Sequence, residues 1–173
     1  SVKWIEINLD VNGKSLVLPC SYETICDITG LLMTTEDTEL MLEPGATEYV
    51  HLYDPTFDYS EEYRQHAMMI VVYNPTGEAM KATDCLVIEV EQLIYDPSFG
   101  APTITFPGGI KVYDELTLEQ AIAMFGTPDE IIDHSDPDGA YVAYDYVFRD
   151  GNSFLWISTS SDQISSITIR IMD

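Results

Sequence analysis

The stretch LTLEQAIAMFGTPDE, residues 116–130, has the pattern of a short, capped helix. Thr117 is a favourable N-cap residue, and Gln120 three positions later completes a capping box. Apolar side chains recur on one helix face, at Leu118, Ala121, Ile122 and Phe125. Gly126 suits the backbone that ends a helix, and Pro128 prevents continuation. A helix of about two turns is marginal alone, so we expect it to pack against another element.

The residues that follow supply that element. Aromatic and β-branched residues alternate with polar ones over 142–148 and 154–159, and isoleucines alternate with polar residues over 166–171. Turns are expected at Asp150–Asn152 and at Ser160–Gln163. The sequence therefore predicts one helix followed by an antiparallel meander.

A similar pattern occurs 96 residues earlier. Thr117 aligns with Ser21 and Gly126 with Gly30, which predicts a second capped helix over 21–30. Four strands are then expected, at residues 39–42, 48–53, 66–73 and 85–95. The last is expected to be half-exposed, because Leu86, Ile88 and Val90 alternate with Glu89 and Glu91.

We therefore predict an α+β fold of two tandem units, each a short helix on an antiparallel β-sheet meander. The first unit covers residues 1–97 and the second 98–173, with a linker at Tyr95–Pro102, whose residues YDPSFGAP favour a loop.

Three stretches carry a family resemblance: residues 114–130, residues 141–157 (YVAYDYVFRDGNSFLWI) and residues 163–171 (QISSITIRI). They resemble the SmpA/OmlA type of outer-membrane assembly lipoprotein and the beta-lactamase inhibitor protein fold, itself a tandem of two helix-plus-sheet units. The whole chain also looks similar to lipoproteins of unknown function from Gram-positive gut bacteria. The resemblance implies an extracellular or cell-envelope location, with a lipid anchor on a cysteine upstream of Ser1. The inhibitor's enzyme-contacting loops have no recognisable match, so the resemblance extends to fold and compartment only.

Charge excludes several classes of partner. The chain has seven Lys and Arg residues against thirty Asp and Glu residues, a net charge of −23. Nucleic acid and anionic membrane are therefore unfavourable partners, because both require clustered basic side chains. No apolar run reaches the length of a transmembrane helix, and residues 1–10 do not resemble a signal peptide. The acidity indicates a solvated surface, with calcium binding or attraction to a basic partner as the alternatives.

The three cysteines, Cys20, Cys26 and Cys85, form no zinc-binding pattern. Two interpretations remain open. Cys20 and Cys85 form one disulfide across the core while Cys26 is buried, or all three are reduced thiols.

The loop DHSDPDG, residues 133–139, is the strongest candidate for a cation site, through the carboxylates of Asp133, Asp136 and Asp138. It does not fit an EF-hand loop, because position 5 is proline and position 12 is a tyrosine. A weak, irregular site and a solvated loop are the two interpretations. Nucleophile-elbow, P-loop and dinucleotide-binding motifs are absent, so we predict no enzyme, no cofactor and no dedicated metal site.

Aromatic residues suggest a binding surface. Tyr141, Tyr144, Tyr146 and Trp156 fall on adjacent expected strands. They either pack with their hydroxyl groups toward water or form an exposed face for a protein or a glycan. We predict protein recognition at the cell envelope, with carbohydrate binding through the Tyr/Trp face as the alternative.

Overall fold

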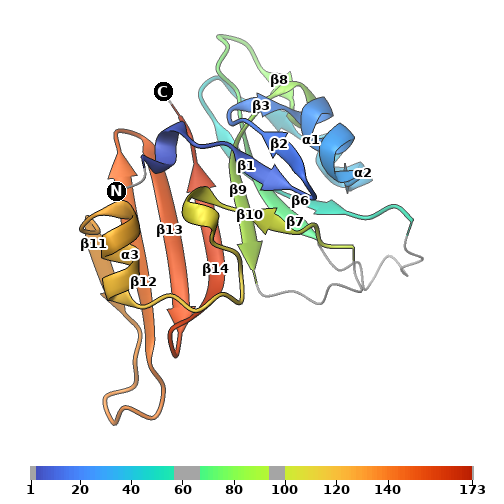
Figure 1. Cartoon of the computed structure of the whole chain (residues 1–173). Coiled ribbons are helices and arrows are strands. Elements are labelled where there is room, and N and C mark those ends of the chain that lie inside the picture. Colours follow the sequence, from blue (N-terminus) through green and yellow to red (C-terminus); the bar gives the residue numbers. More distant parts are fainter. Residues whose placement is uncertain (1–2, 57–66, 94–99, 173) are drawn as a thin grey trace.

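The structure is a computed structural model that describes residues 3–56, 67–93 and 100–172. It consists mostly of antiparallel β-sheet with a few short helices, which agrees with the predicted α+β class (Figure 1). Both expected helices form, α1 at Tyr22–Thr29 and α3 at Leu118–Phe125.

Each helix begins at the predicted hydroxyl. The Ser21 side chain accepts a hydrogen bond from the Thr24 N–H at 3.1 Å. Thr117 accepts from the Gln120 N–H at 3.2 Å, and the Gln120 side chain accepts from the Thr117 N–H at 2.8 Å. This reciprocal pair is the predicted capping box, which satisfies donors that a helix N-terminus otherwise leaves unpaired.

Each helix also ends at the predicted glycine. Gly30 is left-handed, with φ 71° and ψ 6°. Gly126 has φ 91° and ψ −173°, a region open essentially to glycine alone. The Gly126 backbone therefore requires the absence of a side chain, and Gly30 has the left-handed conformation that glycine adopts most readily.

The apolar stripe of α3 is only half buried. Ala121 and Phe125 enter the core, and the Phe125 ring lies 5.2 Å from that of Phe148. Leu118 and Ile122 remain 37% and 39% exposed, so the predicted four-residue stripe was too broad. The buried contact of α3 therefore extends over about one helical turn, from Ala121 to Phe125.

Nine of the described strands form the large sheet. Its order is β11 (Glu130–Asp133), β12 (Ala143–Asp150), β13 (Ser153–Ser160), β14 (Gln163–Arg170), β9 (Leu86–Leu93), β7 (Met68–Tyr73), β6 (Thr47–Tyr53) and β4 (Leu32–Met33); β3 (Cys20–Ser21) also pairs with β9. All pairs are antiparallel. The last strands of the two halves, β9 and β14, are neighbours near the middle of the sheet.

Shorter elements complete the fold. One small sheet has the order β10 (Ile104–Thr105), β1 (Leu9–Val11), β2 (Lys14–Leu16), and another pairs β5 (Met41–Leu42) with β8 (Met80–Lys81). Among the described residues, the other helical turns are η1 (Trp4–Glu6), α2 (Thr35–Thr38), η3 (Ala82–Asp84) and η5 (Pro107–Gly109). The β1–β2 turn uses Asn12 and Gly13, both with positive φ, the conformation that two-residue hairpins favour.

The four strands expected in the first half all form; β6 begins one residue earlier than expected, and the other three are shorter than expected within the described residues. The strand expected over 39–42 is reduced to β5, and the starting residue of the strand expected over 66–73 lies outside the described residues, as does most of the expected linker. A bulge at Ile88 breaks the expected alternation in β9, because Val71 pairs with Glu89 while Val72 pairs with Val87. Val87 therefore enters the core and Leu86 is exposed.

The core lies on one side of the large sheet. Figure 1 shows α3 and the small β10–β1–β2 sheet in front of the large sheet. Side chains of α1, α3 and that small sheet share one apolar cluster with one side of the large sheet, including Ile25, Phe125, Leu16, Ile157 and Ile169. We call the opposite side of the large sheet the open face.

None of the described helices has the length and apolar character needed to cross a membrane.

Candidate functional site

The four predicted aromatic residues do not form one surface. Tyr144 and Tyr146 lie on the core side of β12, where their rings stack with centroids 6.4 Å apart, and Tyr146 is only 2% exposed. Trp156 lies on the open face, because its partner across the β12–β13 pair is Val147. Tyr141 precedes β12 in a loop and is 48% exposed. Of the four residues, only Trp156 therefore lies on the side of the sheet opposite the core.

The acidic loop uses its carboxylates to hold its own backbone. Asp133 accepts a hydrogen bond from the Ser135 N–H at 2.8 Å, and Asp138 accepts from the Ala140 N–H at 3.1 Å. The bond from Ser135 lowers the pKa of Asp133. In the described ranges, no three His, Cys, Asp or Glu side chains converge so that they would hold a metal ion. The carboxylates of Asp133 and Asp138 thus stabilise the turns of the loop that also contains Asp136.

The three cysteines are free thiols in the structure. Cys20 lies in β3 opposite Val87, and the Cys85 thiol donates to the Lys81 carbonyl at 3.4 Å. Burial raises the pKa of the Cys20 thiol to about 11, and it also raises the pKa of Cys85. A thiol with a raised pKa is a poor nucleophile at neutral pH.

The open face carries two cross-strand rows of side chains. The arginine row consists of Arg149, Phe154, Arg170, Glu89, Val71 and Tyr49, which are successive Cα partners from β12 to β6. The tryptophan row, two residues along, consists of Val147, Trp156, Thr168, Glu91, Met69 and His51. Side chains opposite one another in a sheet lie close enough to interact, so each row is a continuous line of contacts.

The centre of the arginine row is an ion pair. Arg170 Nε donates to Glu89 Oε1 at 2.8 Å, and the Arg170 guanidinium carbon lies 5.1 Å from the centroid of the Phe154 ring. The Glu89 side chain is 1% exposed, and burial raises the pKa of its carboxyl although Arg170 opposes the shift. Arg170 is thus held between a carboxylate and an aromatic ring.

The centre of the tryptophan row is a hollow of about 240 Å³. We call it the Trp156 hollow; its lining residues are Tyr49, Glu89, Glu91, Phe154, Trp156, Ser158, Ser166 and Thr168. Burial raises the pKa of the Glu91 carboxyl, and Glu89 raises the pKa of the Tyr49 hydroxyl. Tyr49 is 55% exposed, so an aromatic ring and a polar hydroxyl stand at the rim.

Four carboxylates of the described strands lie on the open face, and three of them have partners. Glu89 pairs with Arg170, Glu130 with Arg149 at 3.5 Å, and Asp145 with His134 at 3.0 Å. The fourth is Glu91, whose side chain has no hydrogen bond or ion pair within residues 3–56, 67–93 and 100–172. Among the described strand residues, the open face therefore presents one carboxylate without a partner, and it lines the hollow.

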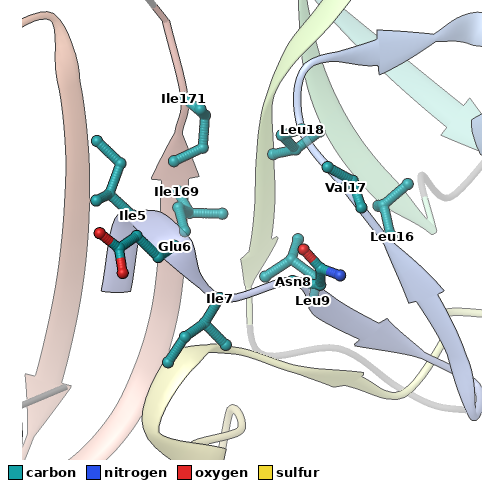
Figure 2. Close-up of a pocket in the computed structure, with 10 residues that line it drawn as sticks. All are labelled: Ile5, Glu6, Ile7, Asn8, Leu9, Leu16, Val17, Leu18, Ile169 and Ile171. Carbon is teal, nitrogen blue, oxygen red and sulfur yellow. The ribbon is translucent and has the colours of Figure 1, made fainter. Parts of the chain in front are cut away.

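A second hollow, of about 170 Å³, lies on the core side between the N-terminal segment, β2 and β14. Figure 2 shows Ile5, Ile169 and Ile171 on one side of it and Leu18 and Val17 on the other. Its lining is largely aliphatic, and Glu6 is its one ionisable side chain. It offers apolar contact area but no group for chemistry.

Sequence reasoning missed most of this arrangement. Glu89 and Glu91 were recognised only as the polar side of a strand, and Arg170 only as a polar position in the alternation. One available signal was the two-residue turn at Gly151 and Asn152, which sets the β12–β13 register and so places Trp156 on the side away from Tyr146.

A scan against protein-family models, a search of curated proteins and a search of solved structures each returned no match to this chain.

Proposed function

We propose that this protein is a protein-recognition module at the cell envelope and that the open face is its binding surface. One observation carries the proposal: the Trp156 hollow is lined by aromatic rings, hydroxyl groups and a carboxylate that has no partner among the described residues, and it lies on a sheet side that the described helices leave uncovered. Aromatic side chains with hydrogen-bonding neighbours are the residues that dominate the energetics of protein interfaces. The proposed role is binding rather than catalysis.

The tandem architecture is part of the same proposal. Helices α1 and α3 lie 96 residues apart, and each follows a segment that pairs with the start of its unit's last strand: Cys20 and Ser21 with β9, and Glu115 with Gln163 of β14. Each helix leads to an outer strand, β4 or β11, and the strands then run inward to the β9–β14 pair. This topology supports two related units, over 1–97 and 98–173, as in the beta-lactamase inhibitor protein fold.

The proposed compartment is extracytoplasmic, with a lipid anchor upstream of Ser1. Its support is the sequence resemblance to envelope lipoproteins, together with a net charge of −23 that disfavours nucleic acid and anionic lipid as partners.

Carbohydrate binding is the second candidate. Trp156 lies beside the hydroxyl groups of Ser158, Ser166 and Thr168 in the same hollow. A sugar ring stacks on an aromatic face while its hydroxyl groups bond to nearby polar side chains, so this set of residues suits a neutral glycan as well.

A capture experiment with three baits tests the proposal. Purified wild-type protein, Tyr49→Ala and Tyr141→Ala are immobilised and exposed to envelope extract from cells that make the protein. Tyr49 and Tyr141 are both exposed tyrosines, but only Tyr49 borders the hollow. We expect Tyr49→Ala to lose a protein that the other two baits retain. An identical catch from all three baits would refute the open face as the binding surface.

A further inference from the structure

The arginine row shows how this sheet accommodates a basic side chain. Phe154, Arg170 and Glu89 lie on three adjacent strands, β13, β14 and β9, and are direct neighbours across the two strand pairs. The guanidinium bonds to the carboxylate at 2.8 Å and lies 5.1 Å from the ring centroid. A cation between an aromatic ring and a buried carboxylate gains both a charge-assisted hydrogen bond and a cation–π contact.

The tryptophan row repeats this arrangement with one substitution. Trp156, Thr168 and Glu91 occupy the same three strands, each two residues from its counterpart in the arginine row. Both rows have an aromatic residue on β13 and a glutamate on β9, but the residue between them on β14 is arginine in one row and threonine in the other. Thr168 is shorter than arginine, and Trp156, Thr168 and Glu91 all line the Trp156 hollow, together with Phe154 and Glu89 of the arginine row.

We propose that the Trp156 hollow receives a basic side chain, arginine or lysine, from a partner protein. The inserted cation packs against Trp156 and pairs with Glu91, as Arg170 does with Phe154 and Glu89. This inference rests on the proposed function and names the chemistry that the open face recognises.

Charge complementarity supports a cationic occupant. Glu91 lacks a partner among the described residues, whereas Arg149 and Arg170, the arginines of the described strands on the open face, are already paired. Partial burial raises the free energy of the ionised Glu91, and this cost is recovered when an opposite charge enters the hollow. The net charge of −23 also attracts a basic partner over distances of about a Debye length, ~8 Å at physiological salt.

The direct test is an NMR titration of the full chain with a single-residue probe. Trp156 supplies an indole N–H resonance in the hollow, and Trp4, buried in the core, supplies an internal reference. The probe is N-acetyl-arginine methylamide, and the control probe is the citrulline analogue, which has nearly the same shape and no charge. We expect a saturable shift of the Trp156 resonance with arginine, no shift of Trp4, and at least fivefold weaker binding of citrulline.

Three variants sharpen the test. Glu91→Gln should weaken arginine binding at least fivefold, whereas Glu48→Gln, which removes the same charge from an exposed site on the other side of β6, should leave it unchanged. Thr168→Arg should fill the hollow and abolish the titration while the protein stays folded by circular dichroism. Equal binding of arginine and citrulline, or undiminished binding to Glu91→Gln or Thr168→Arg, would overturn the inference.

A titration with oligosaccharides distinguishes a basic side chain from a glycan as the occupant of the hollow. Chitotriose and cellotriose are titrated under the same conditions. A shift of Trp156 with either sugar and none with arginine would overturn the basic side chain as occupant. Failure of the arginine titration combined with a partner captured through Tyr49 would refute this inference and leave the proposed recognition function standing.

Discussion

Arg170 of β14 and Glu89 of β9 are Cα partners whose side chains are joined by a 2.8 Å hydrogen bond at the meeting point of the two halves of the chain. The carboxylate is almost completely buried, while the guanidinium is a quarter exposed. The two halves are thus connected through an ion pair on the open face in addition to the backbone hydrogen bonds of the sheet.

Removing Arg170 should therefore destabilise the protein strongly. Arg170→Ala leaves a buried carboxylate without its partner, which typically costs about 3–5 kcal/mol. Urea denaturation at pH 7 measures the loss. The double variant Arg170→Met with Glu89→Gln should recover most of it, because no uncompensated charge remains. A double variant less stable than Arg170→Ala would contradict this account.

The same variant should show a characteristic pH dependence. Burial already raises the pKa of Glu89, and removing Arg170 takes away the group that lowers it. A carboxyl whose pKa is higher in the folded state binds protons more tightly when folded, so stability increases as pH falls through that pKa. The stability difference between wild type and Arg170→Ala should shrink between pH 7 and pH 5. A constant difference would show that the lost contact is not electrostatic.

Glu91 should reduce stability in the unbound protein. Burial raises its pKa above the ordinary value of 4.5, so the charged form at pH 7 carries a desolvation cost that the unfolded chain lacks. Glu91→Gln should increase the free energy of unfolding at pH 7, by no more than about 1 kcal/mol because solvent screens a half-buried group.

The gain from Glu91→Gln should disappear as pH falls below 4.5, where the wild-type carboxyl is neutral in both states. Thermal unfolding of wild type, Glu91→Gln and the Glu48→Gln control across this range measures it. A residue that lowers stability in the unbound protein would fit the proposed binding role, because functional sites often reduce stability. A loss of stability in Glu91→Gln at pH 7 would instead indicate a structural role.

The capping residues should contribute to stability alone. Thr117→Ala and Ser21→Ala should each cost on the order of 1 kcal/mol, because each removes the acceptor of a helix N-terminal N–H. Chemical denaturation measures both costs. A variant that loses partner binding while its melting temperature is unchanged would contradict the assignment of these residues to folding.

Gly126 should tolerate no side chain because of its backbone conformation. Gly126→Val should cost more than about 1 kcal/mol, since φ of 91° with ψ of −173° is strained for a β-branched residue. Gly77→Val is the matched control, because a Cβ meets no atom within 4 Å at either glycine but only Gly126 has a positive φ. Equal stability of the two variants would argue that φ at Gly126 is not the constraint.

The helices and the C-terminal meander could be predicted because their signals are local. A hydroxyl at the cap, a glycine at the end and a two-residue turn each act within a few residues, so α1, α3 and β12–β14 appear at the expected positions. Periodicity also predicted that Leu118 and Ile122 of α3 would be buried, which is wrong. Their burial depends on which other elements pack against the helix, and the helix sequence does not contain that information.

The candidate site could not be predicted because it depends on long-range register. No turn connects β14 to β9, so nothing near Arg170 in the sequence indicates that it faces Glu89, or that Thr168 faces Glu91. The bulge at Ile88 shifts the pairing of β9 with β7 by one residue, which side-chain alternation does not reveal. Grouping Trp156 with Tyr144 and Tyr146 failed for a related reason, because neighbours on adjacent strands share a face only in the correct register.

Site-specific photocrosslinking in cells that make the protein tests the central claim, that the open face binds a partner protein, most directly. A benzoylphenylalanine replaces Tyr49, at the rim of the Trp156 hollow, or Tyr141, an equally exposed tyrosine in the loop before β12. The account predicts a discrete crosslinked protein from position 49 that is absent from position 141 and is lost when Glu91→Gln is added. Crosslinks from position 141 alone, or the same product from both positions, would contradict it.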